Sequence, residues 1–218
     1  MYDFKDPEFG KFPLYKRLAK EHLSIQELKG NVIEWKVLEK KGKFNVPFSY
    51  LIKYKIKSIV ALNQDKSPVY GDEHLIKITF PPTYPTKPPF LYAQTDIWHP
   101  NIKYDDINDK GRICSNSREF GKTFSLYDYV IWIGKIIQYQ IYHAEFTPPF
   151  PEFTPAAEWI LNYVEPNGLI DKANSIHIDN TNLISKTINE SPKPEIVPPA
   201  QVKRRSSIKI KSRSGASP

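Results

Sequence analysis

The spacing of apolar side chains changes along the chain, and each spacing predicts a different kind of element. Over residues 12–28 apolar positions recur every three or four residues, which predicts an amphipathic helix. Further along, apolar and polar positions alternate, and this predicts antiparallel strands with one buried and one solvated face. The alternating segments are residues 33–37, 52–57 and 76–80, followed by a shorter apolar segment at 90–94.

Prolines and capping residues set the boundaries of other elements. Residues 80–89 contain five prolines, which excludes a helix or a central strand and predicts a fixed, extended surface loop. The apolar run at 126–142 predicts a central helix, and Ser125 with Asp128 completes a capping box at its start. No apolar run reaches the roughly 18 residues of a membrane-spanning helix, so none is expected.

A last helix is expected from Pro155 to about residue 164, with Thr154 as its N-cap. Residues 95–124 hold no periodic pattern, which predicts a loop, and they contain Cys114. Together the patterns predict an α+β fold. Its parts are an N-terminal helix, a four-stranded antiparallel meander, the loop, and central and C-terminal helices.

The formal net charge of +7 belongs mainly to the end of the chain. Residues 191–218 hold seven Lys or Arg and one Glu, whereas the first 190 residues hold 24 bases and 23 acids. Because 191–218 also has five prolines, six serines and no aromatic residue, it should be a disordered basic tail. We therefore divide the chain into a globular domain at 1–168, an extension at 169–190 whose structure stays open, and this tail. Because the excess positive charge lies in the tail, only the tail remains a candidate to bind nucleic acid.

Cys114 is the only cysteine of the chain. It excludes intramolecular disulfides and zinc sites built from cysteine pairs, and a reducing, cytoplasmic compartment is the default expectation. A lone cysteine is either a small buried apolar residue or a reactive thiol. Its surroundings favour the thiol, because the rigid turn His99–Asn101 lies upstream and Gly111 permits a positive φ just before it. A thiolate near an amide donor can transfer an acyl group through a thioester.

Four motifs follow one another along the chain. They are Tyr70-Gly71, the string F-P-x-x-Y-P-x-x-P-P at 80–89, H-P-N at 99–101 and G-x-I-C at 111–114. In this order they resemble the ubiquitin-conjugating enzymes, and the order of predicted elements is similar over about residues 11–165. The resemblance implies the fold and the activity of that family. Its members take ubiquitin or a ubiquitin-like protein from an activating enzyme, hold it as a thioester, and pass it to an amine on a target protein.

The resemblance also implies roles for single residues. Cys114 would carry the thioester, and Asn101 would either donate to the oxyanion or brace the active-site loop. His99 would hold the turn through hydrogen bonds to the backbone. No cofactor or metal is implied on the enzyme itself, because the activating enzyme uses the ATP.

Partner surfaces follow from the same resemblance. The N-terminal helix would dock the activating enzyme, and the loops at 81–89 and 120–125 would face a ligase, if one takes part. A protein substrate is the remaining partner that the resemblance implies. The helix residues implied are Lys16, Arg17 and Lys20. The loop residues implied are Pro81, Tyr84 and Pro85.

The chain departs from the family pattern beside the thiol. Asn101 and Cys114 are 13 positions apart, further than is usual in the family. The extra segment carries Asp105, Asp106 and Asp109, whose spacing does not fit a calcium loop and which we expect to be solvated. Phe150 stands where the family has an acidic gate residue. The candidates to replace that residue are His143, Glu145 and Glu152.

These departures resemble divergent bacterial relatives, some of which lie in phage-defence operons with a ubiquitin-like protein. Two interpretations stay open. The chain is an active transferase, or it is an inactive variant of the same fold that binds a ubiquitin-like protein or scaffolds a conjugation complex. Cys114 after G-x-I favours the active enzyme, since inactive variants usually lack that cysteine.

Overall fold

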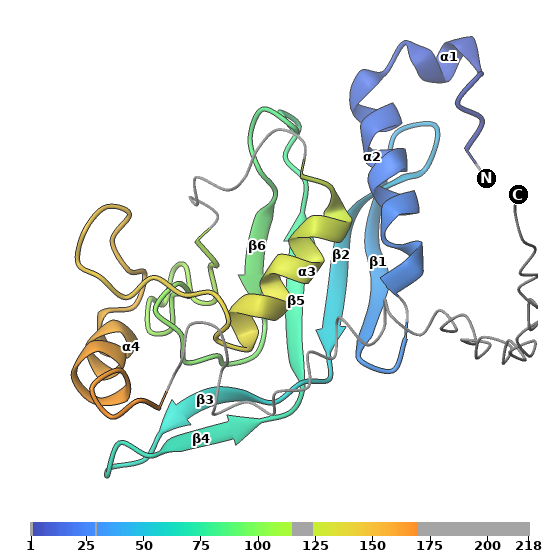
Figure 1. Cartoon of the computed structure of the whole chain (residues 1–218). Coiled ribbons are helices and arrows are strands. Elements are labelled where there is room, and N and C mark those ends of the chain that lie inside the picture. The colour runs from blue at the N-terminus through green and yellow to red at the C-terminus, as the bar shows by residue number, and fades with distance from the viewer. Residues whose placement is uncertain (1, 29, 115–123, 170–218) are drawn as a thin grey trace, which may run out of the picture.

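The structure, a computed structural model (Figure 1), describes residues 2–28, 30–114 and 124–169. A four-stranded antiparallel sheet forms one layer, and helices α2 (Pro13–Ser24) and α3 (Leu126–Ile137) lie over one face of it. The sheet order is β1 (Ile33–Lys41), β2 (Val46–Tyr54), β5 (His74–Thr79) and β6 (Phe90–Ala93). This arrangement confirms the predicted α+β fold with its four-stranded antiparallel sheet.

Smaller elements surround these two layers. They are α1 (Pro7–Gly10), a 3₁₀ turn η1 (Gln26–Leu28), the strands β3 (Ser58–Leu62) and β4 (Pro68–Gly71), helix α4 (Thr154–Trp159) and the π turn η2 (Ile160–Val164). Strands β3 and β4 form a separate two-stranded sheet, inserted between β2 and β5 in sequence. The apolar pattern predicted neither this hairpin nor α1. Most of the predicted extension, and all of the predicted tail, lie outside the described residues.

The core lies between the sheet and α3. Burial alternates along β5, as its sequence predicts, and Ile76 and Ile78 are fully buried. Two polar side chains also fasten α3 to the strands beneath it. The Tyr54 hydroxyl donates to the Val130 carbonyl (2.7 Å), and the Ser58 hydroxyl donates to the carbonyl of Ile137 (2.6 Å). Because these buried groups are paired, they fix the helix without the cost of an unsatisfied polar atom.

Three predicted helix boundaries were wrong. The N-terminal helix ends at Ser24 and continues only as η1. The central helix ends at Ile137 rather than at 142, because Tyr139 turns into a left-handed conformation (φ +57°) and packs its buried ring elsewhere. Helix α4 begins at Thr154, so that Phe153 and not Thr154 takes the N-cap position. The Ser125–Asp128 capping box is confirmed.

Glu21 joins α2 to the start of α3. Its carboxylate is only 2% exposed. It accepts hydrogen bonds from the Leu126 amide (2.5 Å) and the Tyr84 hydroxyl (2.8 Å), and it pairs with Arg17. A buried carboxylate that receives this many donors stabilises the junction only while all of them are present.

We expect Glu21→Gln to lower the free energy of unfolding by about 2 kcal/mol, because the neutral amide cannot accept all three contacts and leaves a buried donor unpaired. Urea denaturation of both proteins measures the difference. Glu8→Gln is the control, since Glu8 is an exposed acid that pairs with Lys11 and Lys43. Equal midpoints for Glu21→Gln and the unaltered chain would contradict the prediction.

Candidate active site

Cys114 is the last described residue of an extended segment, residues 111–114, that is hydrogen-bonded on both sides. On one side the segment pairs with β6 through backbone bonds of 2.7 and 2.9 Å. On the other it pairs with residues 101–103, where the Cys114 amide donates to the Asn101 carbonyl (2.9 Å). The backbone that carries the thiol is therefore held like an inner strand of a sheet.

The entry into this segment requires a glycine. Gly111 has a φ of +84°, and a Cβ at this position would lie 2.1 Å from the Ala93 carbonyl oxygen. Only glycine combines that conformation with so close an approach. The expectation of a positive φ just before the thiol is confirmed.

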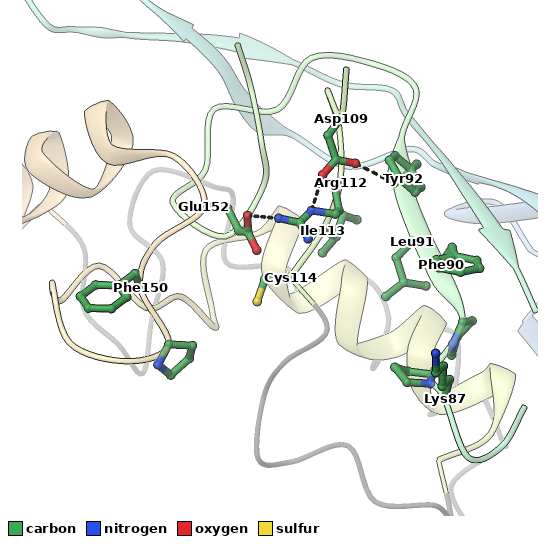
Figure 2. Close-up of a pocket in the computed structure, with 13 residues that line it drawn as sticks. Lys87, Phe90, Leu91, Tyr92, Asp109, Arg112, Ile113, Cys114, Phe150 and Glu152 are labelled. Atoms are coloured by element: carbon green, nitrogen blue, oxygen red, sulfur yellow. Dashed lines mark hydrogen bonds and ion pairs between the residues drawn. The ribbon is translucent and has the colours of Figure 1, made fainter. Parts of the chain in front are cut away.

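Cys114 lines an open cleft of about 730 Å³. In Figure 2 its sulfur points into the space between Phe150 on one side and Leu91 on the other. Phe150 and Phe90, which also lines the cleft, are large apolar side chains exposed to solvent. The half-buried thiol is thus open to a bulky acyl group.

The H-P-N turn is bonded to two neighbouring segments and within itself. Asn101 donates through Nδ2 to the His143 carbonyl (3.2 Å) and accepts through Oδ1 from the His143 amide (2.9 Å). The Pro100 carbonyl accepts from the Glu152 amide (2.8 Å). His99 is fully buried and accepts through Nδ1 from the Asn101 amide (3.1 Å). The turn therefore sets how the loop after α3 lies relative to Cys114.

Burial lowers the pKa of His99 to about 3, with the Ile141 carbonyl opposing the shift. Its ring lies 4.6 Å from that of Tyr139, in surroundings that disfavour the charged form. The imidazole is consequently neutral at physiological pH. With Nδ1 as acceptor, the proton is on Nε2.

We expect His99 alone to make the protein about 2 kcal/mol less stable at pH 5 than at pH 7. The unfolded chain binds a proton at this histidine below about pH 6.5, whereas the folded chain does not, so stability is full above that pH and falls toward pH 3. Nitrogen-15 NMR of the ring should show neutral imidazole down to pH 4. A His99 titration near pH 6.5 in the folded protein would contradict this prediction.

Residues 18–119 match the model of the family described as ubiquitin-conjugating enzyme. The chain is 47% identical over 55 residues to the "Ubiquitin-conjugating enzyme E2" of African swine fever virus (isolate Pig/Kenya/KEN-50/1950), a segment of 22% of this chain and 23% of that protein. Residues 18–119, a little under half of the chain, belong to the ubiquitin-conjugating enzyme family.

Other similar proteins have the same description. The chain is 44% identical over 52 residues to a "Probable ubiquitin-conjugating enzyme E2 31" of Arabidopsis thaliana, covering 24% of this chain and 30% of that one. A solved "Novel Ubiquitin-Conjugating Enzyme" is similar at 14% identity and a TM-score of 0.48, over 74% of this chain and 94% of the other. The matches span under a third of the two curated relatives. Similarity to bacterial members of the ubiquitin-conjugating enzyme family stays a prediction.

The three candidates for the gate of this ubiquitin-conjugating domain separate in space. Glu152 lines the Cys114 cleft, and Arg112 Nη2 donates to its Oε2 (2.7 Å). His143 and Glu145 pair with each other (2.9 Å) and are not among the residues that line the cleft. Of the three candidates, only Glu152 lines the cleft that holds the thiol.

The acids of the extra segment are paired rather than simply solvated, which corrects the sequence-based expectation for two of them. Lys103 contacts both Asp106 (3.0 Å) and Asp109 (3.3 Å), and it is the main cause of the lowered pKa of Asp106. Asp105 is exposed. Within the described part of the chain, no three His, Cys, Asp or Glu side chains gather as metal ligands would. No described helix is long and apolar enough to cross a membrane.

The residues expected to face an activating enzyme differ in exposure. Lys20 is exposed and Lys16 is half-buried. Arg17 points inward, where it pairs with Glu21 and donates to the carbonyl of Phe124 (3.1 Å). Arg17 therefore joins α2 to the segment that precedes α3.

The residues expected to face a ligase differ in the same way. Pro81 and Tyr84 are buried, and the Tyr84 hydroxyl donates to Glu21. Pro85 is exposed. Of the loop expected at 120–125, residues 120–123 lie outside the described residues. In this loop Tyr84 therefore packs inside the protein, whereas Pro85 is exposed and accessible to a partner.

Sequence reasoning missed Arg112, which pairs with both Asp109 (Nε to Oδ2, 2.8 Å) and Glu152 and also lines the cleft. A usable signal was present, since Arg112 is a cation only two positions before the thiol and follows an acid-rich segment. Its partner Glu152 is 40 residues away in sequence, and no local pattern connects the two.

Proposed function

We propose that this chain carries ubiquitin or a ubiquitin-like protein as a thioester on Cys114 and passes it to an amine on a target protein. Membership of the family supports a conjugating function in general. The observation that carries the specific proposal is that the only cysteine of the chain lines an open cleft on a rigid, strand-like backbone. The domain proposed to do this spans residues 1–168.

Thioester exchange does not require a strongly activated thiol. An ordinary cysteine has a pKa of about 8.5 and is a few per cent thiolate at pH 7. The Cys114 thiolate would attack the thioester carbonyl on the activating enzyme. A new C–S bond forms, the old one breaks, and the departing thiolate takes up the proton that Cys114 gave up. Such an exchange depends on access and alignment, which the cleft and the paired backbone supply.

Asn101 is proposed to brace the active-site loop. Both ends of its amide are engaged with the His143 backbone, so the contacts favour support of the loop over direct donation to an oxyanion. His99 is proposed to act structurally, because it is buried, neutral and bonded to the turn. Neither side chain is among those that line the cleft.

Docking of the partners is proposed to use the exposed members of the predicted sets. Lys20 on α2, with the half-buried Lys16, is available to an acidic surface on an activating enzyme. Pro85 is available to a ligase. Arg17, Pro81 and Tyr84 would act indirectly, by holding these surfaces in place.

The test incubates the full chain with a ubiquitin-activating enzyme, ATP and ubiquitin as the probe. We expect an adduct on a non-reducing gel that disappears with reductant and does not form without ATP. If the folded chain forms no adduct with ubiquitin or with a panel of ubiquitin-like proteins and their activating enzymes, the proposal is overturned in favour of an inactive domain.

A further inference from the structure

A line of polar contacts runs from β6 to the wall of the Cys114 cleft (Figure 2). It starts at the Tyr92 hydroxyl, which donates to Asp109 Oδ1 (2.7 Å). The other oxygen of Asp109 pairs with Arg112 Nε (2.8 Å). Arg112 Nη2 in turn donates to Glu152 Oε2 (2.7 Å). All four side chains line the cleft that holds the thiol.

The backbones beneath these side chains are fixed as well. The Arg112 amide donates to the Asp109 carbonyl (3.1 Å), and Arg112 bridges to Tyr92 on β6. The Glu152 amide donates to the carbonyl of Pro100, within the H-P-N turn (2.8 Å). Glu152 is therefore held at its main chain by the turn and at its side chain by Arg112.

Arg112 holds the Glu152 carboxylate in place at the cleft through an ion pair. The Glu152 side chain is only 15% exposed, and a carboxylate removed from water needs a cation or donors to remain charged. Among the described residues, its side-chain contact with Arg112 uses Oε2, which leaves Oε1 to accept from a ligand in the cleft. Without Arg112 the Glu152 side chain would lose the contact that holds it at the cleft and could turn out into solvent.

We propose that Asp109 and Arg112 are positioning residues that hold Glu152 at the cleft, where the Glu152 carboxylate receives the attacking amine. This inference rests on the proposed function and assigns to Glu152 the place of the missing gate acid. It also gives the extra segment between Asn101 and Cys114 a role, since Asp109 belongs to that segment and fixes Arg112 from behind.

The step balances with the residues present. The ammonium of the acceptor lysine gives one proton to Glu152 Oε1, and the neutral nitrogen attacks the thioester carbonyl. As the C–N bond forms and the C–S bond breaks, the Cys114 thiolate leaves and takes up the second proton, which the nitrogen sheds. Glu152 returns its proton to solvent.

The experiment charges the full chain with ubiquitin, isolates the thioester, and mixes it with free lysine or with hydroxylamine. Lysine must lose a proton before it attacks, whereas hydroxylamine is already uncharged at neutral pH. We expect Glu152→Gln to slow discharge to lysine about 100-fold, and Arg112→Gln or Asp109→Asn to slow it about ten-fold. Discharge to hydroxylamine should change little in all three variants.

Lys110→Gln is the matched control. Lys110 belongs to the same segment but pairs with Asp96 (2.8 Å) and is not among the residues that line the Cys114 cleft. We expect both discharge rates to equal those of the unaltered chain. A loss of lysine discharge in Lys110→Gln as large as that in Asp109→Asn would overturn the assignment, because it would reflect general damage to the segment.

A double variant tests whether Arg112 acts through Glu152. If it does, Arg112→Gln combined with Glu152→Gln discharges to lysine no more slowly than Glu152→Gln alone. Arg112→Lys, which keeps the charge, should recover part of the lysine rate. Additive losses in the double variant, or equal losses toward lysine and hydroxylamine, would overturn the inference.

Failure of this inference is distinct from failure of the proposed function. If the thioester forms but Glu152→Gln discharges to lysine at the unaltered rate, Glu152 does not receive the amine, and the proposed function stands. If no reducible adduct forms on the unaltered chain, the proposed function itself is overturned.

Discussion

Replacing Cys114 with serine turns the reducible adduct into one that survives reductant, and replacing it with alanine abolishes the adduct. A serine hydroxyl can accept the acyl group as an oxyester, which thiols do not readily cleave. Because a hydroxyl without an activating base is a much weaker nucleophile than a thiolate, the serine adduct should accumulate at least about ten-fold more slowly. Gels of one reaction, run with and without reductant, measure both effects.

The two variants should fold like the unaltered chain. Cys114 is half-buried, and its amide bonds to Asn101 through the main chain, which neither substitution alters. Urea midpoints of both variants check this. Since the chain has no second cysteine, a reducible adduct that persists in Cys114→Ala would contradict the assignment of the thioester to this residue.

Replacing Gly111 with alanine costs about 4 kcal/mol of stability and slows charging of Cys114. Part of the cost, about 2 kcal/mol, is the strain of a side chain at a φ of +84°. The remainder comes from the Ala93 carbonyl oxygen, which lies 2.1 Å from the new Cβ and must move. Moving it weakens the hydrogen bonds that join this segment to β6, each of which contributes about 1 kcal/mol. Urea denaturation and the charging assay report the two effects.

Gly168→Ala separates the strain from the clash. Gly168 also has a positive φ (+63°), but no atom of the described residues lies within 4 Å of the Cβ that alanine would add there. We therefore expect Gly168→Ala to cost only the strain, about 1–2 kcal/mol, and to leave charging unchanged. Equal costs at the two positions would show that the close approach to Ala93 is not important.

Features set by near neighbours in sequence could be predicted. The capping box needs only Ser125 and Asp128, three positions apart, and it forms as expected. The alternation of apolar and polar residues in β5 predicts that one face of the strand is buried, and the structure shows that burial pattern. The positive φ of Gly111 follows from a residue type that tolerates it. Each signal depends on a few adjacent residues, and tertiary contacts did not override it.

Features set by distant partners could not be predicted. An apolar run cannot tell where α3 ends, because the end depends on Tyr139 leaving the helix to pack its ring against His99. The role of Glu21 depends on Leu126, 105 residues away, and Glu152 meets Arg112 across 40 residues. The sequence therefore predicted the thiol and the His99–Asn101 turn of the candidate site, but it did not predict the ion pairs that border the cleft.

Two hydrogen bonds close the ends of the extra segment between Asn101 and Cys114, and they determine where related proteins can differ in the length of this segment. Lys103 donates through its amide to the Arg112 carbonyl (2.9 Å), and the Gly111 amide donates back to the Lys103 carbonyl (2.7 Å). These two bonds join the two ends of the segment. Residues added or deleted at its exposed tip, around Ile107, therefore need not change the position of the Cys114 thiol. Insertions are thus expected to be neutral at the tip and selected against at the base, next to Asp109.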